Sequence, residues 1–354
     1  MLQDIQVFIV TFSSILWEAM PFIVLGAVVA GILEEMLPQQ LISRILPTYV
    51  IPAVMIGGLL GLIFPMCECG IVVVMRRLLR KGLPLACCVS YMLAGPIVNV
   101  VVLLSTYVAF GGLDEKSRSA AVEMVALRAG LGFVVACVAG LVVHLLERRV
   151  GTAKLLKGIA VPPPKGGLSL NVVDTEPAPE PKKTVFKRLS NISETALHDF
   201  MDITVFLILG AVLAALAKLF IGPDQITVLS QDQPYLAIPA MMALAVLMCL
   251  CSEADAFVAA SFTEMSVSAK LSFLVLGPML DLKLLLMYTR VFRGKLIATI
   301  VTCTVIQTAI YSTIVHVAYD PPEARSQPTL LETATPSTAP TLPTVPTSPT
   351  TQPK

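Results

Sequence analysis

Apolar residues dominate the chain in long runs separated by short polar stretches. A helix needs about 20 apolar residues to cross the hydrocarbon core of a bilayer. Runs of this kind are predicted at 6–33, 50–75, 84–110, 120–146, 200–221, 235–260, 270–290 and 296–318. The pattern therefore predicts an all-α polytopic membrane protein with about four transmembrane helices in each half of the chain.

Two polar segments divide the chain. The first contains several prolines and, between residues 148 and 188, nine basic residues. It is expected to be a flexible linker, and the positive-inside rule places it in the cytoplasm. The last segment consists mainly of Thr, Pro and Ser and is predicted to be disordered. The expected domains are a first transmembrane repeat at 1–147, the linker at 148–198, a second repeat at 199–319 and the tail at 320–354.

A second basic cluster includes Arg76, Arg77, Arg80 and Lys81. The same rule places it in the cytoplasm, and with four crossings in each half the N-terminus falls on that side too. One group of basic residues conflicts with this scheme, because it would face the outside: Arg290, Arg293 and Lys295. Either the second half has a more complex topology, or these residues face a polar pathway.

Composition narrows the class of protein. Of 354 residues, 56% are hydrophobic and 14% are charged, and the net charge is +1. A soluble domain carries about 25% charged residues, so a bilayer is the expected environment, and nucleic acid is not an expected partner. We find no P-loop, Rossmann fingerprint or Ser-His-Asp arrangement, so we expect neither an enzyme nor a cofactor. The first apolar run lacks the features of a cleavable signal.

The two halves of the chain resemble each other in three motifs. The runs 22–28 and 206–212 are alike, Cys67-Glu68-Cys69 resembles Cys249-Leu250-Cys251, and the run 95–99 resembles 277–281. The C-x-C and Gly-Pro motifs keep the same spacing in both halves. Such internal repeats are typical of transporters. Four crossings in each half would make the repeats parallel, whereas re-entrant segments at the motifs would allow them to be inverted.

The C-x-C and Gly-Pro motifs interrupt apolar runs. Proline removes a backbone donor and glycine loosens a helix, so the helices are predicted to break or re-enter there. Broken helices near the bilayer midplane form binding sites in transporters, and an ionisable group inside a span indicates function. Glu68 lies in the first break, and Glu253 and Asp255 follow the second C-x-C. The alternative is that these two second-half acids merely end a helix at the membrane surface.

Two further polar residues follow the Gly-Pro pairs. Asn99 and Asp281 could contact a substrate or ion at the end of a half-helix, or they could simply cap the next helix. Lys283 is within reach of Asp281, and a structural ion pair without a role in transport is a further alternative.

The paired cysteines suggest soft-ligand chemistry. Thiolates select soft ions, so Cys67, Cys69, Cys249 and Cys251 are candidate ligands of a metal or metalloid where the halves meet. The alternative is helix packing through small residues. For the other cysteines, burial as small apolar residues is the expectation.

The combined motifs resemble the bacterial predicted permease family. The residues that carry the resemblance are Cys67 to Gly70, Met75 to Pro84 and Ala94 to Asn99, and it extends over about 5–318 without the linker. The family includes ArsP-like organoarsenical efflux permeases and YraQ-like permeases, and the run 251–257 is closer to the YraQ-like branch. The resemblance implies transport across the inner membrane. For the arsenical branch it implies export of trivalent methylated arsenicals through thiols, which Cys67 and Cys69 would provide.

Two functions follow as hypotheses. The first is an inner-membrane secondary permease for a small solute or ion, such as a soft metal or metalloid species. Glu68 and the acidic motif of the second half depart from the arsenical pattern, and they suit a cation or a proton-coupled substrate better. The second is a membrane subunit of a larger permease complex, with another substrate and no independent transport.

Overall fold

The computed structural model describes residues 2–36, 49–64, 66–111, 115–157, 185–220, 234–262 and 265–319. Every regular element in these ranges is helical, and one isolated bridge joins Leu156 to Phe292. The predicted all-α fold is therefore confirmed. Within the described ranges, three helical segments are long and apolar enough to cross a membrane: Ile5–Val29, Ser117–Val150 and Gly294–Ala318. The predicted disordered tail and the middle of the predicted linker lie outside the described residues.

The helices occur in the same order in both halves. The first half contains α1 (Leu2–Met36), α3 (Val50–Ile63), α4 (Glu68–Arg80), α5 (Leu85–Ala94), α6 (Val100–Phe110) and α7 (Glu115–Val150). A short 3-10 turn, η1 (Thr152–Lys154), follows. The second half contains α8 (Val185–Phe220), α10 (Pro234–Met248), α11 (Ala254–Ser261), α12 (Val267–Leu276), α13 (Leu282–Val291) and α14 (Gly294–Tyr319). Because α8 begins at Val185, helical structure extends into the stretch predicted as linker.

The helix breaks lie where the motifs predict them. Short non-helical connections separate α3 from α4 and α10 from α11 at the C-x-C motifs, and α5 from α6 and α12 from α13 at the Gly-Pro motifs. Side-chain caps stabilise two of the new helix starts. The Asn99 side chain accepts a hydrogen bond from the Val101 amide at 3.0 Å, and Asp281 accepts one from the Leu284 amide at 2.6 Å.

The α3–α4 pair turns back instead of crossing. Along α3, Gly57 faces Cys87 of α5 and Gly61 faces Gly95, so α3 and α5 run parallel. Helix α4 then returns beside α5, with Ile71 against Gly95. The apolar run predicted as one span at 50–75 is therefore a re-entrant hairpin. Hydropathy alone does not distinguish the two, because both bury a similar number of apolar residues.

The second half repeats this arrangement from the other end of the molecule. Helix α10 runs parallel to α12, since Ser272 donates a hydrogen bond to the Ile238 carbonyl and Met242 packs with Leu276. The start of α12 lies near the end of α14, where Ser268 and His316 are 3.2 Å apart. The α10–α11 hairpin therefore enters from the end of the molecule where α14 finishes.

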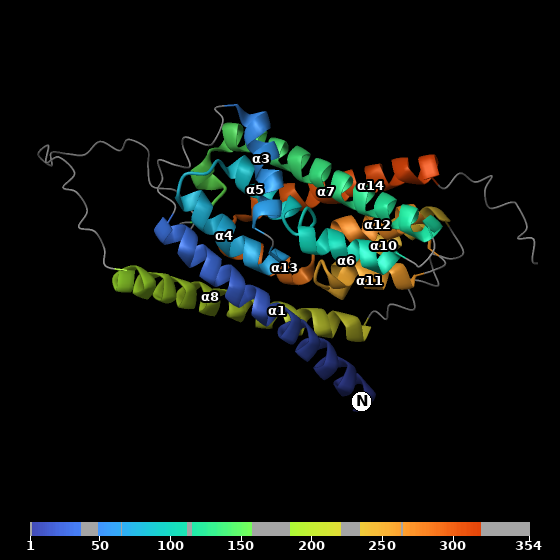
Figure 1. Ribbon diagram of the computed structural model, residues 1–354, viewed down its shortest axis with the longest axis horizontal. Helices are drawn as coiled ribbons and strands as arrows, with labels where there is room; N and C mark the ends of the chain where they lie inside the picture. Colours follow the sequence, from blue (N-terminus) through green and yellow to red (C-terminus); the bar gives the residue numbers. More distant parts are fainter. Residues whose placement is uncertain are drawn as a thin grey trace, which may run out of the picture.

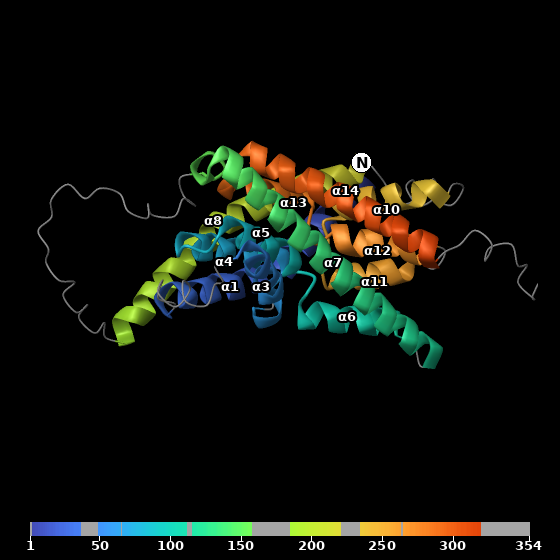
Figure 2. The ribbon, with the colours of Figure 1, turned by 90° about the horizontal axis from the view of Figure 1, so that it is seen from above.

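We call the two ends of the molecule the linker end and the tail end. The linker end contains the C-terminus of α7, the α4–α5 turn and the α13–α14 junction. There the Arg293 amide donates to the Leu155 carbonyl at 2.9 Å. The tail end contains the end of α6, the start of α7, the end of α11, the start of α12 and the end of α14. In Figures 1 and 2, α3, α4 and α5 lie toward the linker end, and α6, α11 and α12 toward the tail end.

The two halves are inverted relative to each other. Helices α1 and α8 pack antiparallel, with Gly31 beside Ile192 and Ile15 packed with Ala211 and Ala214. Each half thus has three segments that run from one end of the molecule to the other and one hairpin that turns back at the centre, where about four crossings were expected. Since three is odd, α1 begins at the tail end, so the expectation that the N-terminus and the linker share a side is wrong. The same correction places Arg290 and Arg293 at the linker end, with the other basic clusters.

Candidate functional site

The four helix breaks meet in the interior, between the two re-entrant hairpins. Helix α4 of the first half contacts α13 of the second, and α6 of the first contacts α11 of the second. The helices α4 and α13 extend from the centre to the linker end, and α6 and α11 extend to the tail end (Figure 1). The centre is therefore built from both halves at once.

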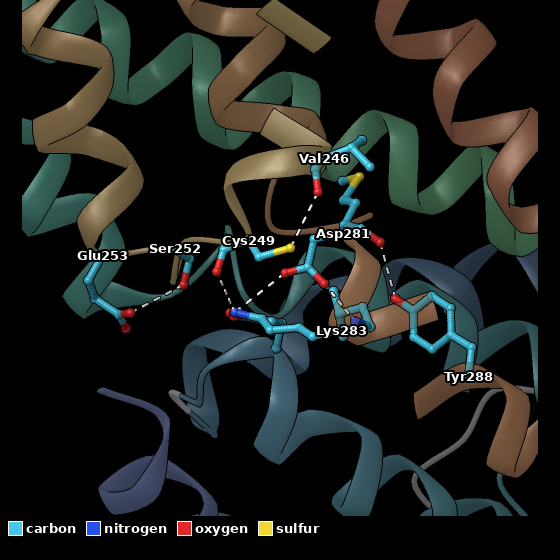
Figure 3. Close-up of polar contacts among 10 residues, drawn as sticks. Val246, Cys249, Ser252, Glu253, Asp281, Lys283 and Tyr288 are labelled. Carbon is cyan, nitrogen blue, oxygen red and sulfur yellow. Dashed lines mark hydrogen bonds and ion pairs between the residues drawn. The ribbon is translucent and has the colours of Figure 1, made fainter. Parts of the chain in front are cut away.

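Lys283 lies at the middle of this centre and is 1% exposed. Its ammonium is 2.8 Å from Glu68 Oε1 and 3.4 Å from Asp281 Oδ2. It also donates a hydrogen bond to the Cys249 carbonyl at 3.2 Å. Figure 3 shows Lys283 pointing toward Asp281 and the Cys249 backbone. The lysine thus joins the first break of one half to both breaks of the other half.

The backbone at Cys249 is unusual. Its φ of 51° lies in the left-handed region, which non-glycine residues adopt rarely. Helix α10 ends at Met248, and this turn directs the Cys249 carbonyl toward Lys283. Backbone conformations of this kind cost about 1–3 kcal/mol and persist only where the surroundings impose them. The Cys249 thiol donates a hydrogen bond to the Val246 carbonyl (Figure 3), and it lies beside the backbone amides of Leu282 and Lys283.

A second charged pair lies on the tail side of the centre. Arg128 of α7 is fully buried and donates to Thr106 at 2.7 Å and to the Ser252 carbonyl at 2.9 Å. Its guanidinium interacts electrostatically with Asp255, which is 2% exposed. Arg128 thus connects α6 and α7 of the first half with the C-x-C segment of the second.

Most of these acids were predicted from the sequence, whereas most of the contacts that neutralise them were not. Glu68, Asp255 and Asp281 are buried as expected, and Asn99 is a buried cap. The predicted Lys283–Asp281 ion pair is present, with Glu68 as an additional partner. Glu253 is partly exposed and accepts a hydrogen bond from Ser252. Arg128 was missed, although a basic residue inside the apolar run 120–146 is itself a signal.

The four predicted thiol ligands do not form one cluster in the described part of the chain. The four C-x-C cysteines are buried, and Cys67 contacts Cys69. Cys249 instead packs with Ile15 and Ala211. Among the described residues, no three side chains of His, Cys, Asp or Glu are placed to hold a metal ion. A contact between these thiols and a transported substrate remains a prediction.

A small pocket leads from the linker end toward the centre. Its lining residues are Val72, Val73, Arg76, Phe206, Met287, Arg290 and Val291. Val72 and Met287 lie one helical turn beyond Glu68 and Lys283, respectively. Within the outer part of the pocket, the Arg290 guanidinium stacks 5.7 Å from the centre of the Phe206 ring. The pocket therefore follows the α4–α13 pair.

Inverted halves, re-entrant hairpins and a buried charged centre define a polytopic membrane protein of transporter-like architecture. The comparison with known families agrees with this class. The chain belongs to the predicted permease family, whose sequence profile matches residues 4–317. The resemblance seen in the motifs is thereby confirmed over nearly the whole chain.

Two curated relatives match over most of their length. UPF0718 protein YcgR of Bacillus subtilis (strain 168) is 34% identical over 296 residues, which is 83% of this chain and 92% of that protein. A protein of Streptococcus mutans serotype c, named as a proposed subunit of a two-component membrane permease complex, is 31% identical over 311 residues. This match covers 86% of this chain and 94% of that protein. No solved structure matches this chain.

Proposed function

We propose that this protein is a secondary permease that moves a small solute or ion across the bacterial inner membrane. The observation that carries the proposal is the meeting of four helix breaks, two from each inverted half, at a buried charged centre. In transporters, discontinuous helices place freed backbone groups and helix ends around substrates and coupling ions. Buried ionisable side chains are expensive in a membrane, and a transport pathway gives them a role.

We assign the substrate contacts to the residues around the helix breaks. The acids would contact a cation or a protonated substrate, Asn99 would position the substrate, and the thiols would contact a soft species such as a trivalent organoarsenical. The proposed residues are Cys67, Glu68, Cys69, Asn99, Cys249, Cys251, Glu253, Asp255 and Asp281. We add Lys283 to this group, because it contacts two of the acids directly.

We place the linker end in the cytoplasm. The positive-inside rule counts basic residues close to the ends of the spans. With the inverted topology, most of these residues lie at the linker end, and Arg118 and Lys270 lie at the tail end. Those at the linker end are Arg76, Arg77, Arg80, Lys81, Arg148, Arg149, Lys154, Lys157, Arg290, Arg293 and Lys295. The pocket along α4 and α13 would then be the cytoplasmic entrance. The Arg128 contacts, which lie on the other side of the centre, would close the outer half of the pathway.

A second candidate function is that of a membrane subunit of a larger complex, and the name of one relative supports it. The protein from Streptococcus mutans is named as a proposed subunit of a two-component complex. This chain could likewise need a second membrane subunit. Purified full-length chain that transports in liposomes without other proteins would contradict this alternative. Transport that appears only when a copurifying membrane protein is included would favour it.

The permease proposal is tested by accumulation in whole cells. Cells with the wild-type chain, Cys67→Ser/Cys69→Ser or Glu68→Gln are compared for methylarsenite, arsenite, Zn²⁺, Cu⁺ and Cd²⁺. If the wild type lowers the accumulation of one soft species and the cysteine variant does not, the result would support thiol contacts. If liposomes containing the chain move none of a wider panel of cations and organic solutes, the permease proposal is wrong.

A further inference from the structure

The surroundings of the Lys283 ammonium form a cage of three oxygen atoms. Glu68 Oε1 is 2.8 Å away, the Cys249 carbonyl 3.2 Å and Asp281 Oδ2 3.4 Å. One oxygen comes from the start of α4, one from the turn after α10 and one from the cap of α13. The cage is thus assembled from both halves, and all three residues are about 1% exposed.

Two features of the cage are not explained by the binding of the Lys283 ammonium alone. Glu68 Oε2 is buried and has no hydrogen-bond partner among the described residues. An orphaned carboxylate oxygen in the interior is unfavourable unless another ligand uses it. The left-handed backbone at Cys249 also turns its carbonyl into the cage, although a strained conformation is not required to end a helix. Both observations indicate a site arranged for a ligand.

The net charge of the cage favours a ligand with one positive charge. Glu68 and Asp281 contribute two negative charges when ionised. Both residues lie at helix N-termini, α4 and α13, and each terminus contributes roughly +0.5 of an elementary charge. The remaining charge is about −1, which one monovalent cation neutralises. A divalent cation, or an alkali ion together with Lys283, would leave a buried positive charge.

The chemistry of the cage selects a hard cation. All three groups that contact the ammonium are oxygens, from two carboxylates and one carbonyl. Oxygen ligands suit hard cations, whereas the nearby thiols would suit soft ones. The Cys249 thiol donates a hydrogen bond to the Val246 carbonyl and is not one of the three groups that contact the ammonium. Unwound backbone carbonyls at half-helix ends are also the ligands that transporters use for Na⁺.

We propose that the cage of Glu68, Asp281 and the Cys249 carbonyl is a binding site for a monovalent alkali cation. Lys283 occupies it in this structure as a tethered competitor. The site holds either the ammonium or the free cation, so binding of the cation requires the lysine side chain to leave. This inference rests on the proposed permease function, for which it supplies the coupling ion.

The test uses purified full-length protein in detergent. Thermal unfolding is followed in NaCl, KCl, MgCl₂ and choline chloride at equal ionic strength. We expect Na⁺ to raise the Tm of the wild type relative to choline, and Mg²⁺ to add no comparable stabilisation. Lys283→Gln lacks the competitor, so its apparent Kd for Na⁺ should be at least tenfold lower. Lys295→Gln, which changes an exposed lysine at the linker end, should behave as the wild type.

Three outcomes would overturn the inference. These are a folded Lys283→Gln variant with the same Tm in NaCl, KCl and choline, a larger effect of Mg²⁺ than of Na⁺, or a dependence on pH with none on alkali ions. If Lys283→Gln does not fold, binding of ²²Na⁺ to the wild type is compared with Glu68→Gln. We expect saturable binding that Glu68→Gln weakens at least tenfold, and equal binding by both proteins would contradict the site.

The binding test is independent of the transported substrate. A protein that transports but shows no alkali binding would overturn the cation site and leave the permease proposal standing. A protein that binds Na⁺ at Glu68 but moves no solute or ion in liposomes would overturn the permease proposal instead.

Discussion

At the scale of single residues, the interior contains two basic side chains that neutralise different acidic side chains. Lys283 contacts Glu68 and Asp281, and Arg128 interacts with Asp255. Taking charges out of water is costly, so a buried ion pair adds little net stability. Removing one partner is a different matter, since it leaves an uncompensated charge in a medium of low dielectric.

Lys283→Met should therefore destabilise the protein strongly. Without the ammonium, two buried carboxylates remain unpaired, and the free energy of unfolding should fall by about 3–5 kcal/mol. The double variant Glu68→Gln/Lys283→Met should recover part of this loss, because it removes one of the two charges. Thermal unfolding in choline chloride measures the loss of stability in Lys283→Met and its partial recovery in the double variant. Equal Tm values for the wild type and Lys283→Met would show that the carboxylates are not ionised there.

Arg128 and Asp255 should be energetically coupled. Arg128→Met and Asp255→Asn each leave a buried group without its partner, whereas the double variant removes both charges. We expect a coupling free energy of about 1–3 kcal/mol from the double-mutant cycle. Chemical denaturation of the four proteins provides the measurement. Strict additivity would mean that the two side chains do not interact.

Part of this residue pattern could be predicted from the sequence. Glu68, Asp255 and Asp281 are acids within apolar runs, and the sequence identifies such positions directly. Lys283 was expected to pair with Asp281 because the two are close in the chain. The Lys283–Glu68 and Arg128–Ser252 contacts join residues from different halves, and no local pattern encodes such distant pairs.

At the scale of helices, close packing at glycine fixes the re-entrant hairpin. A Cβ at Gly57 would lie 2.4 Å from the Cys87 carbonyl, and one at Gly61 would lie 2.6 Å from the Gly95 Cα. Backbone atoms cannot move aside cheaply at such distances. The hairpin α3–α4 therefore depends on these glycines to approach α5. The sequence predicted the helix breaks but not the hairpin, because breakers show where a helix stops and not where the chain goes next.

Gly61→Ala should be strongly destabilising. Overpacking of a filled interior costs about 1–3 kcal/mol, and backbone clashes lie at the upper end of this range. Gly130→Ala is the matched control, because nothing lies within 4 Å of a Cβ at this position of α7. It should be neutral or stabilising by up to about 1 kcal/mol, since alanine favours helices. The Tm of each purified variant is measured, and a Gly61→Ala variant as stable as Gly130→Ala would contradict the packing.

At the scale of the whole molecule, the inversion of the halves reconciles the topology with the charges. The repeat was visible in the sequence, but its orientation was not. The orientation depends on whether a run of apolar residues crosses or returns. Four crossings in each half would have placed three basic residues outside: Arg290, Arg293 and Lys295. This conflict already indicated that the predicted number of crossings was too high. Three crossings place the α13–α14 junction beside the end of α7.

The topology predicts opposite accessibility for two engineered cysteines. Lys154→Cys lies at the linker end and Ser261→Cys at the tail end, and both positions are exposed. A membrane-impermeant maleimide should label Ser261→Cys in intact spheroplasts and Lys154→Cys only in inverted vesicles. The wild type is the control for the native cysteines, which are buried or partly buried. Labelling of both positions from one side would contradict the inverted arrangement.

The pairing of α4 with α13 and of α6 with α11 has a consequence for how such a protein could arise. Each pair takes one helix from each half. In the repeat, α4 corresponds to α11 and α6 corresponds to α13, so the second pair is the first with the two halves exchanged. A single ancestral half could form both pairs only by associating with a copy of itself inserted upside down. An isolated half would then be an antiparallel homodimer with an axis of symmetry in the membrane plane, and joining the copies through an extramembrane segment would fix their opposite orientations.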